Sequence, residues 1–260
     1  MSEQKQIGTE SEESQDDKDM GLMDHLDELR KRLMYIIISV IIGSAIAGYF
    51  IEPLMNGLLL KPAIEANLDL QNLRVFGKPM LYFKVILISG VIIAFPFILF
   101  QIWKFVEPAL YAAERGWARR ITFFTTFCFL SGITFSYIVM IPSMLDFSAN
   151  FGTDNIRNLI DINDYWGFIM LMILSAGVFF EMPMVSFVLS RFGLLTPRFL
   201  RKYRRHAIVV ILIIAAILTP SPDPFNQLIV ATPIYLLYEI SIIISAVSIK
   251  KYYKNEENEQ

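Results

Sequence analysis

Carboxylates beside or inside apolar stretches are the groups in this sequence with the clearest potential for chemistry. Glu28 stands just before the first apolar stretch, and Glu114 lies between the second and the third. Leucines at helical spacing around Glu28 predict an amphipathic helix at a membrane surface, in which Glu28 would pair with Arg32 one turn away. Glu114 lies next to Arg115 and equally suits a local ion pair. Each carboxylate therefore has a structural explanation as well as a functional one.

Glu181 differs from these because it lies well inside the fourth apolar stretch, in Phe179-Phe-Glu-Met-Pro183. An ionisable side chain within a membrane span is costly, and it marks either a function or a buried polar contact. One hypothesis is therefore a proton-coupled transporter of small solutes that uses Glu181. The absence of an internal sequence repeat weighs against it, because many such transporters are built from repeats. Glu239, in the last apolar stretch, is a weaker case of the same kind.

Other kinds of chemistry find no support in the sequence. The motifs of nucleotide-binding loops, zinc proteases and serine hydrolases are missing. His25 and His206 have no second histidine at ligand spacing, and the single Cys128 permits neither an intrachain disulfide nor a cysteine-cluster metal site. The sequence therefore predicts a protein that is not an enzyme, holds no metal or cofactor and binds no nucleic acid.

The composition indicates that a membrane positions these residues. Apolar residues make up 55% of the 260 positions and charged residues 18%, against about 25% charged in an average soluble protein. Five apolar stretches of 19 to 26 residues are long enough for a hydrocarbon core that needs about 20, whereas a sixth has only 12. In chain order the six are Leu33–Ile51, Leu81–Val106, Ile121–Ile141, Tyr165–Leu189, the short Ala207–Leu218 and Phe225–Ile249.

The distribution of basic residues predicts the topology. If the N-terminus is cytoplasmic and all six stretches cross, the inner segments hold 17 Lys and Arg and the outer segments four. If the short stretch did not cross, the basic segment 191–205 and the basic C-terminus would lie on opposite faces. We therefore expect an all-α, polytopic membrane protein with six transmembrane helices and both termini in the cytoplasm.

The short fifth stretch predicts a locally thin or concave region beside the fifth helix, where the bilayer thins or protein shelters the helix ends. Twelve helical residues cover roughly 18 Å at 1.5 Å each, against a hydrocarbon core of about 30 Å. The prolines of Thr219-Pro-Ser-Pro-Asp-Pro224 end the helix there. The semi-apolar segment 52–80, on the outer side, is expected to pack as a cap.

Three parts of the chain differ in composition. Ten of the 25 acidic residues lie in the first 28 positions, whereas from position 29 onward 21 Lys and Arg face 15 Asp and Glu. We therefore expect an acidic, disordered cytoplasmic tail at 1–20, a six-helix transmembrane domain at 21–250 and a cytoplasmic C-terminal tail at 251–260.

Four motifs in this order carry a resemblance to a known family. They are His25-Leu-Asp-Glu-Leu-Arg-Lys-Arg-Leu33, Phe105-Val-Glu-Pro-Ala-Leu-Tyr111 followed by Glu114-Arg115, Phe180-Glu-Met-Pro183, and Leu218-Thr-Pro-Ser-Pro-Asp223. Together with the six apolar stretches, they make residues 20–250 resemble the TatC family, the multi-spanning core of the twin-arginine protein translocase. The resemblance implies a receptor for folded proteins whose signal peptides carry paired arginines.

The resemblance also assigns roles to single residues. It implies that Glu28 and Glu114 contact the two arginines and that Phe105 and Pro108 belong to the same recognition surface. A carboxylate suits this task, because it meets a guanidinium with two parallel hydrogen bonds, which a lysine ammonium cannot form. The positions that the resemblance ties to translocation are Pro53, Glu181 and Asp223.

The resemblance finally implies partners and an energy source. Thr219 and Gln227 match polar positions at which the single-span subunits TatA, and TatB where present, dock along the fifth helix. The receptor complex is expected to contain several copies of the chain. Transport is expected across the bacterial cell (inner) membrane and to use the proton-motive force.

Overall fold

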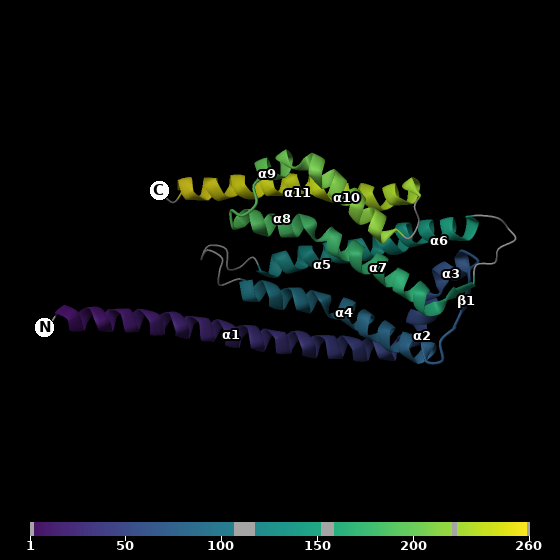
Figure 1. Ribbon diagram of the computed structural model, residues 1–260, viewed down its shortest axis with the longest axis horizontal. Coiled ribbons are helices and arrows are strands. Elements are labelled where there is room, and N and C mark those ends of the chain that lie inside the picture. The colour runs from purple at the N-terminus through teal and green to yellow at the C-terminus, as the bar shows by residue number, and fades with distance from the viewer. Residues whose placement is uncertain (1–2, 107–117, 152–158, 220–222, 259–260) are drawn as a thin grey trace.

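A computed structural model of the chain describes the backbone of residues 3–106, 118–151, 159–219 and 223–258. Side chains are described for residues 26–105, 121–151, 159–219 and 223–248. Long helices lie side by side along one axis, with α2, α3 and β1 gathered at one end and the two ends of the chain at the other (Figure 1).

Among the described residues, five segments are long and apolar enough to cross a membrane, and they coincide with the five long apolar stretches of the sequence. They are Leu26–Tyr49, Gly77–Phe105, Ile121–Asn150, Ile162–Arg191 and Pro224–Ser248. The helices that form them are α1 (Glu3–Tyr49), α4 (Gly77–Val106), α5 (Ala118–Phe135) with η4 (Ser136–Met140) and α6 (Ile141–Asn150), α7 (Ile162–Phe180) with α8 (Met182–Arg191), and α11 (Pro224–Asn258). The predicted all-α membrane architecture is confirmed to this extent.

The sixth stretch forms α10 (Arg204–Leu218), which has 15 residues and follows the short α9 (Pro197–Lys202). At 1.5 Å per residue α10 is about 22 Å long, shorter than a hydrocarbon core of about 30 Å. The number of six crossings therefore stays a prediction, as does the thinned bilayer.

The acidic N-terminal segment forms the first part of α1, which begins at Glu3. The segment has no proline and is rich in Glu, Gln and Lys, which favour helix. The three predicted parts of the chain, the disordered tail at 1–20 among them, stay predictions.

The segment after α1 packs as a cap, as the sequence predicts. It contains α2 (Ile51–Pro53), the π-helix η1 (Leu54–Leu59), α3 (Lys61–Glu65) and β1 (Asp69–Gln71), which pairs in parallel with β2 (Leu159–Asp161). Met55, Leu59 and Ala63 are buried in the main apolar core. The Tyr165 hydroxyl donates to the carbonyl of Leu59 at 2.7 Å, which fastens the cap to α7.

Small residues allow the helices to approach closely. Gly43 of α1 faces the backbone of Gly90 in α4, and a Cβ added at either glycine would overlap the other helix. Between α8 and α11, the Ser190 hydroxyl donates to Ser245 at 2.7 Å, and both side chains are buried. Such contacts are typical of membrane proteins, in which packing and interhelical hydrogen bonds replace the hydrophobic effect between helices.

Candidate functional site

Glu28 belongs to a small polar network that joins α1 to α4. Its Oε1 accepts a hydrogen bond from Nε of Arg32 at 3.1 Å and a second from Nη2 of the same arginine. Nη1 of Arg32 donates in turn to Oε1 of Gln101 in α4 at 3.3 Å. The side chains of Arg32 and Glu28 are 14% and 33% exposed. The predicted pairing one helical turn apart is confirmed, and the contact with Gln101 is an addition that sequence spacing could not supply.

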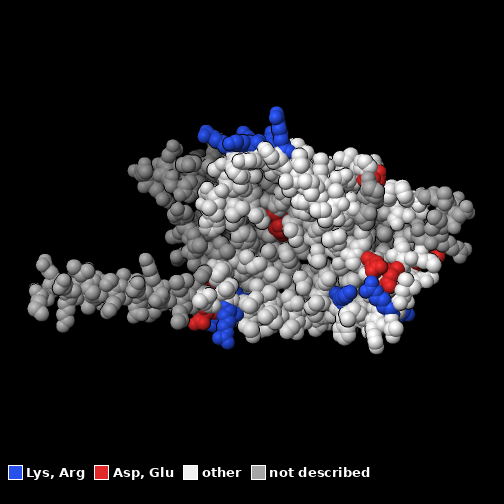
Figure 2. Space-filling model, viewed as in Figure 1, with Lys and Arg blue, Asp and Glu red and all other residues white. Residues whose placement is uncertain are grey.

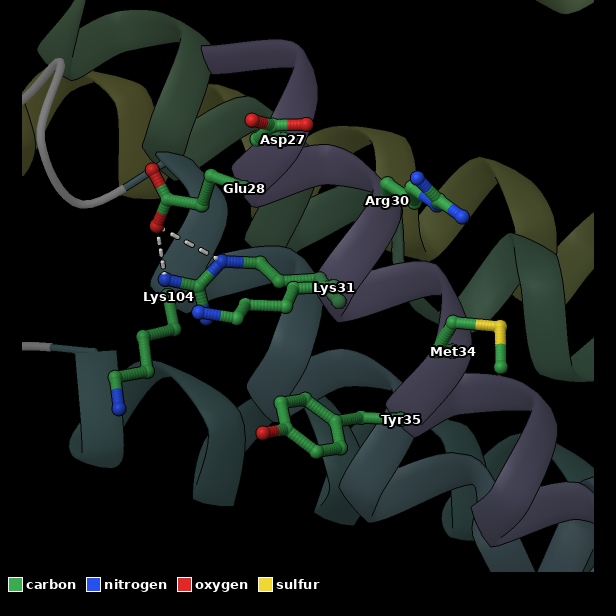
Figure 3. Close-up of a pocket in the computed structure, with 8 residues that line it drawn as sticks. Asp27, Glu28, Arg30, Lys31, Met34, Tyr35 and Lys104 are labelled. Atoms are coloured by element: carbon green, nitrogen blue, oxygen red, sulfur yellow. Dashed lines mark hydrogen bonds and ion pairs between the residues drawn. The ribbon is translucent and has the colours of Figure 1, made fainter. Parts of the chain in front are cut away.

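An open groove of about 750 Å³ lies beside this network. Its charged residues come from α1 except for Lys104, which projects from α4. In Figure 3, Glu28 and Tyr35 point to the side of α1 that faces Lys104, whereas Arg30 and Met34 point away from it. The complete lining is Asp27, Glu28, Arg30, Lys31, Arg32, Met34, Tyr35 and Lys104. The groove thus combines two carboxylates with four cations and has room for a polar peptide.

The other predicted recognition residues are placed only in part. Phe105 is half-buried near the end of α4, one residue beyond Lys104, so it lies close to the groove. Pro108 and Glu114 lie outside the described residues. Their approach to Glu28 therefore stays a prediction. Glu28 lies beside the last turn of α4, close to the point at which the chain continues toward Pro108 and Glu114.

Glu181 lies at a break in the fourth span. The helix α7 ends at Phe180 and α8 begins at Met182, with Pro183 in the first turn of α8. Proline has no N–H and cannot continue the hydrogen bonding of α7. Both carboxylate oxygens of Glu181 are buried, and neither has a hydrogen-bond partner within the described part of the chain. Figure 2 shows an acidic spot near the middle of the molecule, and the surface directly around it carries no other charge.

The polar residues at the C-terminal end of α10 are engaged within the protein. The buried Thr219 hydroxyl donates to the carbonyl of Ala215 at 2.9 Å, and Nε2 of Gln227 donates to the carbonyl of Leu212 at 2.9 Å. The Asp223 carboxylate accepts the N–H of Asn226 at 3.0 Å and so caps the first turn of α11, which begins at Pro224. Of the three, Gln227 joins α11 to α10, whereas Thr219 and Asp223 form contacts at the ends of their own helices.

Two further predicted residues have clear positions. Pro53 is exposed and ends α2 in the cap. Glu239 lies in α11, where Arg204 donates to it at 2.6 Å and the Tyr235 hydroxyl at 3.0 Å. Sequence reasoning did not find Arg204 as the partner, because 35 residues separate the two in the chain.

An ion cluster at the cap end was missed by sequence reasoning. Asp161 accepts hydrogen bonds from the backbone N–H of Asn163 at 2.7 Å and from its side chain at 3.0 Å, and Arg74 lies 3.7 Å away. The Asn163 hydrogen bonds, with a smaller contribution from Arg74, hold the pKa of Asp161 below its usual range. Arg74 also donates to Asp164 at 3.0 Å. The sequence offered one signal for this cluster. Asp161 directly precedes the helix α7, and aspartate is a common N-cap residue.

Comparison with known proteins decides the family. The family model described as "Sec-independent protein translocase protein (TatC)" matches residues 24–233. A protein of that name from Carboxydothermus hydrogenoformans is 36% identical over 230 residues, which are 88% of this chain and 94% of the relative. The chain belongs to the TatC family. The resemblance inferred from four motifs is thereby confirmed.

Other TatC proteins are similar over most of their length. TatCy of Bacillus subtilis is 34% identical, with 91% of this chain and 92% of the relative covered. Two crystal structures described as the twin arginine translocase receptor TatC match this fold with TM-scores of 0.74 and 0.75. They are 34% and 35% identical and cover 86% and 85% of this chain and 99% of each solved chain.

Family membership fixes the general function. As a TatC protein, the chain is a multi-pass membrane component of a Sec-independent protein translocase. The TatC family is a family of translocase membrane subunits, not a family of catalytic enzymes.

Proposed function

We propose that this TatC protein is the receptor and core subunit of a twin-arginine translocase. It binds signal peptides that carry paired arginines and, with TatA-type and TatB-type partners, moves folded proteins across the bacterial cell membrane by means of the proton-motive force. The observation that supports this most directly is a partly exposed Glu28 that already binds a guanidinium beside an open groove.

The geometry around Glu28 suggests how a signal peptide binds. An incoming arginine replaces Arg32 on the Glu28 carboxylate, and Arg32 keeps its second contact, with Gln101. The exchange trades one charged pair for another, so no carboxylate is left unpaired. An arginine can form two parallel hydrogen bonds with Glu28, whereas a lysine acts only as a point charge. The groove of about 750 Å³ accommodates the residues beside that arginine.

The second arginine is assigned to Glu114, with Phe105 and Pro108 in the same surface. Phe105 is the last residue of α4 whose side chain is described, and it follows Lys104 of the groove, so the chain leaves α4 close to the groove. Pro53, Glu181 and Asp223 are proposed to act in translocation, and Thr219 and Gln227 to line the docking site for TatA or TatB.

The proposed topology has six crossings with both termini in the cytoplasm. It is supported by the two ends of the chain lying at the same end of the bundle (Figure 1) and by the excess of Lys and Arg that this arrangement assigns to the cytoplasm. The complex is proposed to contain more than one copy of the chain.

Substitution of Glu28 tests the proposed receptor function. In nanodiscs, Glu28→Gln should weaken binding of an Arg-Arg signal peptide about tenfold or more, because a hydrogen bond between charged groups is worth about 1.5–3 kcal/mol. Asp27→Asn is the matched control, since Asp27 lines the same groove and forms no ion pair with Arg32. Equal affinity of wild type and Glu28→Gln would reject the role of Glu28.

Glu181 supports a second candidate function, proton-coupled transport of a small solute, because its buried oxygens lack a partner among the described residues. Solute uptake into liposomes that is lost in Glu181→Gln would favour it. Under the receptor proposal, Glu181→Gln leaves peptide binding unchanged and impairs only the export of folded cargo.

A further inference from the structure

One face of α1 turns toward α4 and lines the groove beside Glu28. Four groove residues share this face because they stand three or four positions apart in the helix, namely Glu28, Lys31, Arg32 and Tyr35. In Figure 3, Glu28, Lys31 and Tyr35 extend from α1 to the side on which Lys104 of α4 lies. The charged residues on this side of the groove are thus one carboxylate, Glu28, and three cations, Lys31, Arg32 and Lys104.

The lysines of this face have no anionic partner among the described residues. The Glu28 carboxylate is held by Arg32. Asp27 stands one helical turn before Lys31, yet no ion pair joins the two. Nζ of Lys104 lies 5.9 Å from the centre of the Phe100 ring, a favourable contact that supplies no counter-charge. Two exposed ammonium groups therefore line one groove without an anion between them.

The exchange proposed at Glu28 adds a third cation to these two. Once a peptide arginine takes the Glu28 carboxylate, the guanidinium of Arg32 keeps only the uncharged amide of Gln101 as a partner. The Arg32 side chain is 14% exposed, and a charge that is largely buried without a counter-ion is costly. Since the second peptide arginine is assigned to Glu114, this side of the groove needs an anion from elsewhere once the peptide is bound.

We propose that the groove recognises an acidic residue of the signal peptide, located within two positions of the paired arginines. Its carboxylate accepts hydrogen bonds from the ammonium groups of Lys31 and Lys104, and the Tyr35 hydroxyl supplies a further donor. Two residues of extended peptide span about 7 Å, which keeps the carboxylate in the groove that holds the arginine. This recognition rests on the proposed receptor function, because it concerns the residues beside the arginines.

Peptides that differ in one residue test this recognition. In nanodiscs, the full-length protein should bind a signal peptide with Arg-Arg-Asp about fivefold more tightly than the same peptide with Arg-Arg-Asn, because two ion pairs at an exposed site add modestly to affinity. The double variant Lys31→Gln with Lys104→Gln should bind both peptides equally. Lys78→Gln removes an exposed cation at the opposite end of α4 and should keep the preference. Equal affinity of the wild type for both peptides would overturn the proposal.

Charge reversal separates a direct contact from a general effect of charge. Lys104→Glu should bind a peptide with Arg-Arg-Lys more tightly than one with Arg-Arg-Asp, which reverses the order expected for the wild type. Circular dichroism and thermal unfolding establish that the variant is folded. A folded Lys104→Glu that keeps the wild-type order would contradict the contact between Lys104 and the peptide carboxylate.

Lys-Lys peptides separate failure of this recognition from failure of the receptor function. A wild type that prefers Arg-Arg-Asn to Lys-Lys-Asn, but does not prefer Arg-Arg-Asp to Arg-Arg-Asn, keeps the receptor function and overturns the acidic-residue proposal. A wild type that binds Arg-Arg-Asp and Lys-Lys-Asp equally overturns recognition of the paired arginines itself. The expected order of affinity is Arg-Arg-Asp first, Arg-Arg-Asn second and the Lys-Lys peptides last.

Discussion

At Glu28 a carboxylate already holds a guanidinium, that of Arg32 from its own helix. The pair is only partly buried, so it can exchange without exposing a deeply buried charge. Arg32 thus has two roles in the proposed function. It keeps Glu28 in position before the peptide arrives, and it competes with the peptide for the same carboxylate.

Removal of Arg32 measures that competition. Arg32→Gln should tighten binding of an Arg-Arg peptide several-fold, because the peptide no longer displaces a resident guanidinium. Isothermal titration in nanodiscs measures the affinity, and Arg30→Gln, whose side chain points away from Glu28 in Figure 3, is the control. Weaker binding by Arg32→Gln would show that Arg32 supports the peptide and does not compete with it.

Asp161 gives a prediction of pH dependence at the cap end. Its pKa is lower in the folded protein, so the stability that it contributes is present above its unfolded pKa, about 3.9, and is lost as the pH falls through its folded pKa. In detergent, Asp161→Asn should therefore lower the unfolding temperature at pH 7, and the difference from wild type should shrink below pH 4.

Asp164→Asn is the matched control for this effect, because Asp164 contacts the same Arg74 but is 70% exposed. It should change the unfolding temperature little at either pH. A difference between Asp161→Asn and wild type that stays constant from pH 7 to pH 3 would contradict an electrostatic role for Asp161.

Ion pairs between residues close together in the sequence could be predicted, whereas pairs between residues far apart in the sequence could not. Glu28 and Arg32 lie one helical turn apart, so their pairing follows from helix geometry alone. The contacts of Arg32 with Gln101 and of Arg204 with Glu239 span 69 and 35 residues, and they depend on how the helices pack. For the same reason the residue pattern identified Glu181 as unusual but could not show that its oxygens lack a partner.

At the scale of the helices, hydropathy and length predicted the five long spans because membrane thickness dictates them. The register between spans could not be predicted in this way, because it depends on small residues that carry little sequence signal. Gly43 and Gly90 are isolated glycines in apolar stretches, yet they set the approach of α1 to α4. That approach positions Glu28 and Arg32 beside Gln101 and Lys104.

Enlarging Gly90 tests this contact between helices. A Cβ at position 90 would lie 2.6 Å from the backbone N and Cα of Ser44, which cannot move away as a flexible side chain could. Gly90→Ala should therefore destabilise the protein by about 1–3 kcal/mol. Thermal unfolding in detergent measures the loss.

Gly57→Ala is the control for Gly90, because nothing lies within 4 Å of a Cβ at position 57. It should unfold at nearly the wild-type temperature. If Gly90→Ala were as stable as Gly57→Ala, the close approach of α1 and α4 would not be a determinant of the fold.

At the scale of the whole molecule, the bundle separates two ends with different contents. The cap and the Arg74 cluster lie at one end, whereas α1 and α4 bring the Glu28 groove toward the other. Between them lies a nearly uncharged surface, interrupted by an acidic spot in the view of Figure 2. This arrangement suits a receptor that reads a signal on one side of a membrane.

Site-specific photocrosslinking tests the central proposal most directly. A photoreactive residue at position 31, which lines the groove and leaves Glu28 intact, should crosslink to a precursor whose signal peptide carries Arg-Arg. A second probe at position 114 should give the same product, and a probe at Lys61 in the cap should give none. The crosslinks from 31 and 114 should disappear with a Lys-Lys signal and with Glu28→Gln. Crosslinks that persist equally under both changes would contradict recognition of the paired arginines at this groove.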